Sequence, residues 1–356
     1  MVSSLSRHLK FAEAIREALD LCLAEDPAVY VMGLGVPDPK GIFGTTAGLQ
    51  EKYGARRVMD IPASENGITG IALGSALVGM RPVLTHQRLD FALLSMEQIV
   101  NQAAKWHYTF SGAACVPMVI RMITGRGWGQ GPQHSQSLQA WFAHIPGLKV
   151  VMPATPYDAK GLLIASIRDN NPVVFLEHRW LYNISGPVPE GMYTSPLGKA
   201  RVVIEGTDAT IAATSYMVVD AVRAARLLEE DSIRVEVVDI RTLRPLDEET
   251  ILTSVGKTGR LVAADTGVKA GGFAGEILAL ASERVFGSLK CAPVRVALPD
   301  HPIPTTPALA NLVYPRPADL ANAVRRMLGM APRDPAITDQ PSGPLDVPDP
   351  SFSGPF

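Results

Sequence analysis

The sequence lacks the marks of several protein classes. Its three cysteines, Cys22, Cys115 and Cys291, lie far apart and form neither a CxxC pair nor a zinc-binding spacing, so we expect reduced, buried thiols in a cytoplasmic protein. A net charge of −2 leaves no electrostatic footprint for nucleic acid or for an anionic membrane. No apolar run is long enough to cross a bilayer, and none follows the basic start, so we expect neither a membrane span nor a signal peptide.

Two widespread phosphate-binding motifs are also missing. Neither GxGxxG nor GxxxxGK[ST] occurs in the 356 residues, so the sequence offers neither a dinucleotide-binding turn nor a P-loop.

The chain is rich in apolar residues. Hydrophobic residues make up 47% and charged residues 19%, which is ample for large buried cores. At about 150 residues per domain, the length predicts two domains.

Apolar runs rich in β-branched residues alternate with stretches of helical period, which predicts βαβ units and two doubly wound α/β domains. We expect the first domain over 1–181, a linker over 182–199, the second domain over 200–331 and a Pro-rich tail, disordered or draped, over 332–356. In the first domain we expect strands at Val58–Ile61 and Pro82–His86, and helices at Asn66–Val78 and Phe91–His107.

Glu65 is the most informative single residue. It lies in IPASENGITG, where an apolar strand is followed by a carboxylate and a glycine-bearing helix start. A carboxyl group at such a turn is partly desolvated, which favours its protonated form and lets it share a proton with a ring nitrogen of a bound heterocycle. The alternative is an ordinary helix N-terminal carboxylate stabilised by the helix dipole.

Several longer strings resemble one family. They are SENGITGIALGSALVGMRPV, FALLSMEQIVNQAAK, QHSQSLQAWFAHIPGLKVVMPATPYDAKGLL, IRDNNPVVFLEH, RTLRPLDEETI and GGFAGEI. Over roughly residues 8 to 330 the chain resembles the β-subunit of thiamine-diphosphate-dependent 2-oxoacid dehydrogenases, the decarboxylating component of pyruvate, branched-chain and acetoin dehydrogenase complexes. The resemblance implies a pyrimidine-binding domain followed by a transketolase C-terminal-type domain.

The resemblance implies catalytic roles for two residues. Glu65 would hydrogen-bond the pyrimidine nitrogen para to the amino-bearing carbon and so favour the imino tautomer, which removes the thiazolium proton. His134, in GPQHSQ after a glycine-rich loop, would assist proton movements on the substrate oxygen or acyl transfer to a lipoyl arm. The alternative for His134 is a loop histidine satisfied by a backbone carbonyl.

The resemblance also implies the walls of a cofactor pocket. Phe91 matches an aromatic residue that packs on the aminopyrimidine ring, with plain core packing as the alternative. His86, Gln87 and Leu89 stand where the family is often rich in acidic and aromatic residues. We expect these three to bind the cofactor too, with His86 as a second catalytic candidate. Leu34 replaces a glutamate that connects two active sites in the family.

The resemblance implies a cation site at the string IRDNNP. Asp169 and Asn171 match a segment that binds a monovalent cation, usually potassium, in some relatives, and backbone carbonyls near Met118 and Ser166 would complete it. An oxygen-rich turn after a helix suits a hard cation. The alternative is a helix C-terminus followed by an Asx turn.

One motif of this superfamily is absent. The string GDG, followed later by Asn, binds the diphosphate through Mg²⁺, and GDG does not occur here. The resemblance therefore implies a separate α-subunit that holds diphosphate and Mg²⁺, in an α₂β₂ heterotetramer. Close-packing glycines at 67, 70, 74 and 79 support an interface.

The sequence thus predicts the β-subunit of an enzyme that decarboxylates a 2-oxoacid and transfers the acyl unit to lipoamide, with a lipoyl acyltransferase core as a further possible partner. Two alternatives remain. Leu34 and the altered segment Thr85–Leu89 would also suit an acyloin-forming or ketol-transferring enzyme without a lipoyl partner. The chain could instead be a non-catalytic structural β-like subunit, which the presence of both Glu65 and His134 argues against.

Overall fold

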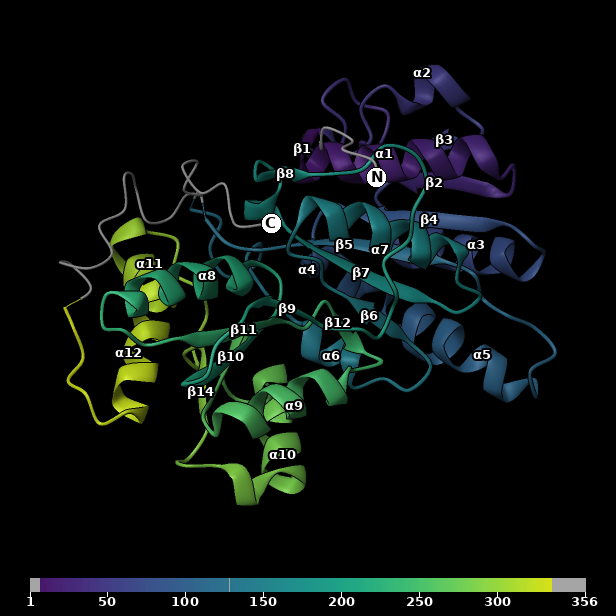
Figure 1. Cartoon of the computed structure of the whole chain (residues 1–356). Helices are drawn as coiled ribbons and strands as arrows, with labels where there is room; N and C mark the ends of the chain where they lie inside the picture. The colour runs from purple at the N-terminus through teal and green to yellow at the C-terminus, as the bar shows by residue number, and fades with distance from the viewer. Residues whose placement is uncertain (1–6, 128, 335–356) are drawn as a thin grey trace, which may run out of the picture. The chain divides into compact units, whose positions relative to one another are not determined.

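The computed structural model describes residues 7–127 and 129–334, which form two compact units (Figure 1). Unit 1 comprises the described part of Met1–Thr124, with Trp141–Leu197 and Leu243–Pro245. Unit 2 comprises the described parts of Gly125–Ala140 and Leu246–Phe356, with Gly198–Thr242. Most of the Pro-rich tail expected over 332–356, from residue 335 on, lies outside the described residues.

Unit 1 is built on a seven-stranded sheet in the order β12-β6-β7-β5-β4-β2-β3. The pairs from β6 to β3 are parallel. The expected α/β class is confirmed, and the central strands are buried on both faces, as a parallel sheet covered by helices requires. The strands are β2 (Val29–Gly33), β3 (Val58–Met59), β4 (Arg81–His86), β5 (Val119–Thr124), β6 (Lys149–Val151), β7 (Val173–His178) and β12 (Thr242–Arg244).

The helices of unit 1 follow the apolar spacing of the sequence. In α1, for example, the buried positions include Phe11, Ile15, Leu19 and Cys22, which recur every three or four residues and form one face. That face packs against α7. The helices are α1 (Phe11–Glu25), η1 (Ile42–Gly44), α2 (Leu49–Tyr53), α3 (Glu65–Leu77), α4 (Leu89–Ala92), η2 (Leu93–Ser95), η3 (Glu97–Ala103), α5 (Ala104–Thr109), α6 (Gln139–Ala143), α7 (Pro156–Arg168) and η4 (Arg179–Leu181).

Unit 2 is a five-stranded sheet in the order β14-β13-β10-β11-β9, parallel except for the antiparallel edge strand β9. Its strands are β9 (Arg201–Ile204), β10 (Ala209–Ala213), β11 (Val235–Asp239), β13 (Leu261–Val268) and β14 (Val294–Leu298). Its helices are α8 (Tyr216–Glu229), α9 (Glu248–Thr258), α10 (Phe273–Arg284), η5 (Phe286–Ser288), α11 (Pro307–Val313) and α12 (Pro317–Met327).

Several local expectations differ from the structure. The single helix expected over Phe91–His107 is a succession of α4, the 3₁₀ turn η2, the π-helix η3 and α5. The expected linker contains β8 (Ser185–Pro187), which pairs antiparallel with β1 (His8–Lys10). Residues such as Ser, Gly and Pro have little strand propensity, so only the pairing reveals this strand.

The cysteines are unpaired, but the expectation that all three are buried was wrong. Cys22 is buried in α1, Cys115 is exposed and Cys291 is half-buried. Burial raises the pKa of the Cys22 thiol to about 12, which keeps it protonated and inert. Within the described residues no helix is both long and apolar enough to cross a membrane.

A fully buried ion pair joins strands β5 and β7. The guanidinium of Arg121 donates from Nε to Oε1 of Glu177 at 2.6 Å and from Nη2 to Oε2 at 2.9 Å, and both side chains are 0% exposed. The hydroxyl of Tyr182 donates to Oε2 of Glu177 at 2.9 Å. Burial, and the Glu177 carboxylate beside it, raise the pKa of Tyr182 well above its usual value. The pair thus fixes the register of the central strands.

Glu177→Gln should lower the free energy of unfolding by about 3–5 kcal/mol, because it leaves the buried Arg121 charge without a counter-charge. Urea denaturation followed by circular dichroism measures the loss. The matched control, Glu25→Gln, removes an ion pair with Arg168 whose side chains are 55% and 47% exposed, and should cost less than about 1 kcal/mol. Equal losses in the two variants would contradict the expected cost of leaving the Arg121 charge buried without its partner.

Candidate functional site

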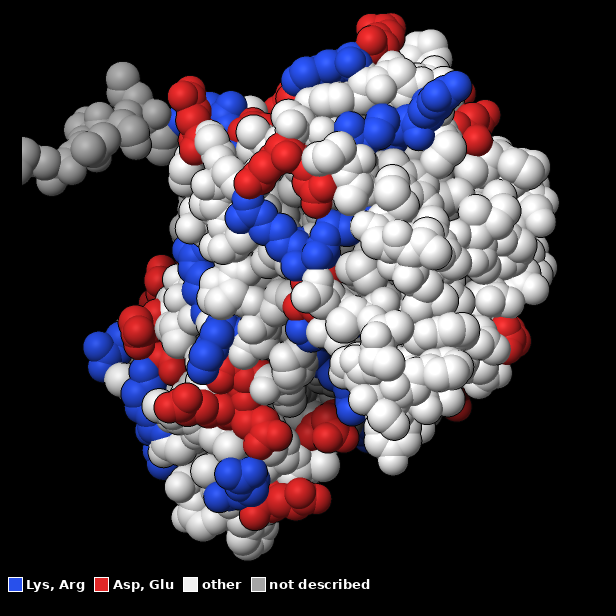
Figure 2. All heavy atoms as spheres, turned by 90° about the vertical axis from the view of Figure 1, so that its right-hand side faces the viewer, with Lys and Arg blue, Asp and Glu red and all other residues white. Residues whose placement is uncertain are grey.

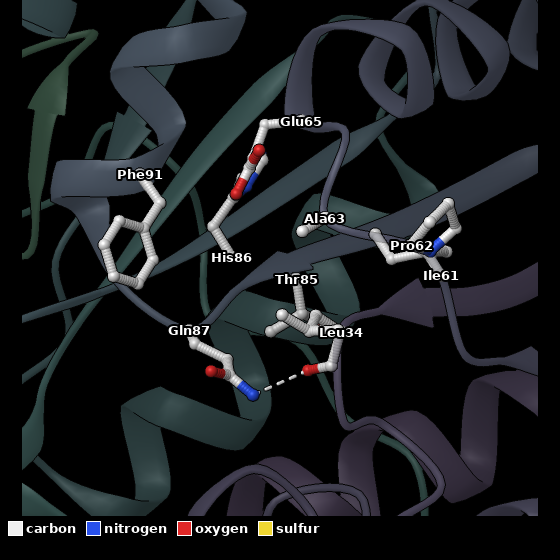
Figure 3. A pocket seen from close by; sticks show the side chains of 9 residues that line it. All are labelled: Leu34, Ile61, Pro62, Ala63, Glu65, Thr85, His86, Gln87 and Phe91. Atoms are coloured by element: carbon white, nitrogen blue, oxygen red, sulfur yellow. Dashed lines mark hydrogen bonds between the residues drawn. The ribbon is translucent and has the colours of Figure 1, made fainter.

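A pocket lies at the carboxyl edge of the unit 1 sheet, between the ends of β2, β3 and β4 (Figure 3). The chain passes from β2 to β3 on one side and then crosses to β4 on the other side of β2, so the strand order reverses here. Such a switch point is where open α/β sheets bind ligands. This switch-point pocket is lined by Leu34, Ile61, Pro62, Ala63, Glu65, Thr85, His86, Gln87 and Phe91.

The loops around the switch-point pocket are held by hydrogen bonds between side chains and backbone groups and by one close approach of two strands. The carboxylate of Asp60 accepts hydrogen bonds from the amide of Gly35 at 2.9 Å and from that of Ile61 at 3.0 Å. A Cβ on Gly33 would lie 2.5 Å from the carbonyl oxygen of Thr85, so only glycine lets β2 approach β4 this closely. Nε2 of Gln87 donates to the carbonyl of Leu34 at 2.8 Å. These contacts tie the three strand ends together.

Glu65 is the first residue of α3 and points into the switch-point pocket (Figure 3). Its N-cap, Ser64, makes no side-chain capping bond. The carboxyl is half-buried among apolar residues such as Ile61 and Ala63. A carboxyl group in this position can form a hydrogen bond with a ring nitrogen of a heterocycle bound in the pocket.

Phe91 faces Glu65 across the switch-point pocket from the short helix α4 (Figure 3). Its ring is half-buried and forms part of the pocket wall. Gln87 lines the same pocket, whereas Leu89 is fully buried and is not among the lining residues. Of the residues expected to bind the cofactor, the structure therefore brings together Glu65, His86, Gln87 and Phe91.

His86 ends β4 and also lines the switch-point pocket. Its side chain is 4% exposed, and Nε2 has no hydrogen-bond partner among residues 7–127 and 129–334. Burial lowers the pKa of His86 to about 4, because the charged imidazolium would lose its hydration. At neutral pH this ring is therefore uncharged.

His134 is half-buried on segment 125–140, which belongs to unit 2. That segment is fastened within unit 2 at several points. Nε2 of Gln139 donates to Oδ1 of Asp265 at 2.5 Å, and the guanidinium of Arg126 lies 4.1 Å from the ring centroid of Tyr314. His134 is thus carried by a loop anchored on the second unit, and not by the strands around Glu65.

The residues of the expected potassium site contact one another. The carboxylate of Asp169 forms an ion pair with Lys149 and accepts from the backbone and side-chain nitrogens of Asn171, both at 2.8 Å. The carbonyl of Met118 accepts from the amide of Val173, and that of Ser166 from the amide of Asp169. Burial raises the pKa of the Asp169 carboxyl, but the Lys149 ammonium and the hydrogen bonds from Asn171 outweigh this effect and lower the pKa below its usual value. This is the Asx turn of the alternative interpretation, and potassium binding stays a prediction.

Ile61, Pro62 and Ala63 line the switch-point pocket although no chemistry marks them in the sequence, and Leu34, which stands where the family has a glutamate, lines it too. Asp60, which positions the loops, was also missed. The signal that could have found them is topological, because each of these residues comes shortly after a strand that ends at the same sheet edge.

Comparison with known proteins defines the class first. The family model of the transketolase pyrimidine-binding domain matches residues 7–185, and that of the transketolase C-terminal domain matches residues 198–320. A split-gene transketolase, solved as an inactive β4 tetramer, has the same fold with a TM-score of 0.72 at 24% identity, over 91% of this chain and 99% of that one. The chain is a two-domain protein of the transketolase type.

Proteins similar in sequence show which family within this class the chain belongs to. The acetoin:2,6-dichlorophenolindophenol oxidoreductase subunit beta of Cupriavidus necator is 43% identical over 91% of this chain and 98% of its own length. The pyruvate dehydrogenase E1 component subunit beta of Acholeplasma laidlawii is 40% identical over 90% of this chain and 98% of its own length. The mitochondrial pyruvate dehydrogenase E1 component subunit beta of Pisum sativum is 40% identical over 91% of this chain and 91% of its own length. The chain therefore belongs to the β-subunit family of thiamine-diphosphate-dependent 2-oxoacid dehydrogenases.

The switch-point pocket fits the aminopyrimidine half of thiamine diphosphate. A carboxyl at one side, an aromatic face opposite and an apolar floor suit a flat, weakly basic heterocycle. The unpartnered Nε2 of His86 adds a polar atom with nothing to bind among the described residues. The nine lining residues include no lysine or arginine, so the pocket holds no counter-charge for a diphosphate.

Proposed function

We propose that this chain is the catalytic β-subunit of a two-chain enzyme that decarboxylates a 2-oxoacid and transfers the acyl unit to lipoamide. The observation that carries the proposal is the direction of the Glu65 carboxyl, which points into the switch-point pocket opposite Phe91 (Figure 3). A structural subunit would have no need to keep a half-buried acid in an apolar hollow.

Each side chain has a defined task in this proposal. Thiamine diphosphate, when bound, supplies the carbon nucleophile that attacks the keto group and then holds the electrons left by decarboxylation. Glu65 holds a proton at the pyrimidine ring nitrogen. Phe91 packs on the ring face, and Gln87 holds the loop of Leu34 in place through its hydrogen bond. His134, from segment 125–140, would move a proton at the substrate oxygen.

The diphosphate and its Mg²⁺ would be held by a separate α-subunit carrying the GDG…N motif, in an α₂β₂ heterotetramer. Support comes from the absence of GDG in this chain and from the word "subunit" in the names of the relatives. A cytoplasmic location fits three unpaired cysteines. A lipoyl acyltransferase core is a further partner in this proposal.

A surface suited to the α-subunit lies on α3 and η2, which pack against each other. We call it the uncharged face, and it includes Ile71, Val78 and Leu94, which are 60%, 81% and 67% exposed. Glu65 is the only charged residue between 64 and 79. Figure 2 shows the side on which α3 and α5 lie, and a broad part of it carries no charged side chain. Exposed apolar area of this kind marks protein interfaces.

Glu65→Gln should lower the turnover of the assembled enzyme by about 10²-fold or more, because glutamine cannot exchange a proton with the ring nitrogen. Steady-state turnover with 2-oxoacid and a lipoyl domain measures it. The control is Glu51→Gln, which changes another first-turn glutamate, in α2, outside the switch-point pocket and should retain the wild-type rate. Unchanged turnover in Glu65→Gln would remove Glu65 from the mechanism and favour a structural subunit.

A second candidate function keeps the cofactor and changes the acceptor. Leu34 and Thr85 line the switch-point pocket without adding an acid to Glu65, which favours an acyloin-forming or ketol-transferring enzyme that works outside a large complex. The chain with its α-subunit, a 2-oxoacid and an aldehyde, but no lipoyl protein, distinguishes the two. The main proposal predicts no hydroxyketone and a strict need for the lipoyl domain. Hydroxyketone formation at the lipoyl-dependent rate would establish the second function instead.

We also propose that K⁺ binds at the turn of Asp169 and Asn171 beside the carbonyls of Met118 and Ser166. Bound K⁺ would raise the melting temperature by roughly 2–4 °C in KCl relative to choline chloride of equal ionic strength. Differential scanning fluorimetry measures the difference between the two salts, which Asp169→Ala should abolish. Identical melting curves of the wild type in both salts would rule the site out.

A further inference from the structure

The switch-point pocket contains a second titratable group whose function the proposed reaction leaves open. Glu65 and His86 are the only titratable side chains among its nine lining residues. The two come from different elements, the start of α3 and the end of β4 (Figure 3). The resemblance leads one to expect acidic and aromatic residues around position 86, so it implies a pocket wall here but does not say which contact an imidazole would make.

Without a ligand, the buried and unsatisfied Nε2 of His86 lowers the stability of the fold. Its Nε2 is buried and has no hydrogen-bond partner among the described residues. An unsatisfied buried donor or acceptor destabilises a fold by about 1–3 kcal/mol, and such groups in native structures commonly meet a ligand or an ordered water. Because His86 lines a pocket that suits a heterocycle, a bound ligand is the partner that the position offers.

The charge state of His86 suits a neutral aminopyrimidine. Burial lowers the pKa of this imidazole to about 4, so the ring carries no charge at neutral pH. A neutral imidazole can present Nε2 as either donor or acceptor. It can therefore bind a polar edge of the heterocycle without placing a positive charge near the cationic thiazolium of the same cofactor.

We propose that Nε2 of His86 is a second hydrogen-bonding contact to the aminopyrimidine whose ring nitrogen Glu65 holds. This inference rests on the proposed function and deepens it. In this chain, unlike the pattern expected from the family, the pyrimidine is bound by one acid and one neutral imidazole. His86 is a cofactor-binding residue that sets affinity and orientation, and no proton transfer is assigned to it.

The test compares cofactor affinity with cofactor-free stability. In the complex with the α-subunit and saturating Mg²⁺, His86→Phe should raise the Kd of thiamine diphosphate about 5- to 10-fold, as the loss of one hydrogen bond predicts. His86→Gln, which keeps a polar group, should restore a large part of the affinity. The cofactor-free chain with Phe at this position should melt at the wild-type temperature or above it, because an unsatisfied buried atom has been removed.

The control is His8→Phe, the same change on the exposed strand β1, which should leave the Kd unchanged. A wild-type Kd in His86→Phe would overturn the inference. So would a lower cofactor-free melting temperature with equal affinity losses in the Phe and Gln variants, since that result indicates a packing role. Failure of the wild-type complex to bind thiamine diphosphate would instead refute the proposed function, so the two failures are distinguishable.

Discussion

The structure depends on one constraint, which is that a carboxyl group must stand at the point where the strand order of a parallel sheet reverses. Glu65 occupies that point because α3 begins there, and α3 begins there because β3 ends after two residues and the chain turns at Pro62 to Ser64. There the carboxyl points into the switch-point pocket, opposite Phe91. The remaining contacts of the switch-point pocket serve to keep this geometry.

Buried strands and a buried ion pair form a rigid scaffold behind the switch-point pocket. Strands β4, β5 and β7 are buried on both faces, and the Arg121–Glu177 pair locks two of them in register. Nη1 of Arg121 also contacts Oγ1 of Thr85 at 3.5 Å, so the ion pair reaches a residue that lines the pocket. A buried pair of this kind adds little net stability, but breaking it is costly. It therefore specifies one arrangement of the strand ends that carry Thr85 and His86.

The sequence predicts the fold and half of the site well, for identifiable reasons. The helix expected over Asn66–Val78 differs from α3 by one residue at each end, because buried apolar positions recur there at helical spacing. Glu65, His86, Gln87 and Phe91 were found because they carry chemistry or fall in the family's motifs. The π-helix Glu97–Ala103 was not predictable, since it has the same apolar period as an α-helix. The pairing of β1 with β8 was not predictable either, since β8 consists only of Ser, Gly and Pro. Asp60 was missed because only strand order brings it to the site.

The most direct measurement is the ¹⁵N chemical shift of bound thiamine diphosphate labelled at the pyrimidine nitrogen para to the amino-bearing carbon, in the complex with the α-subunit. If the Glu65 carboxyl shares its proton with that nitrogen, the wild-type complex shows a shift displaced toward that of a protonated ring, and the Glu65→Gln complex shows the shift of free thiamine diphosphate. The same shift in both complexes, with the cofactor fully bound in each, would contradict a role for Glu65 at the heterocycle.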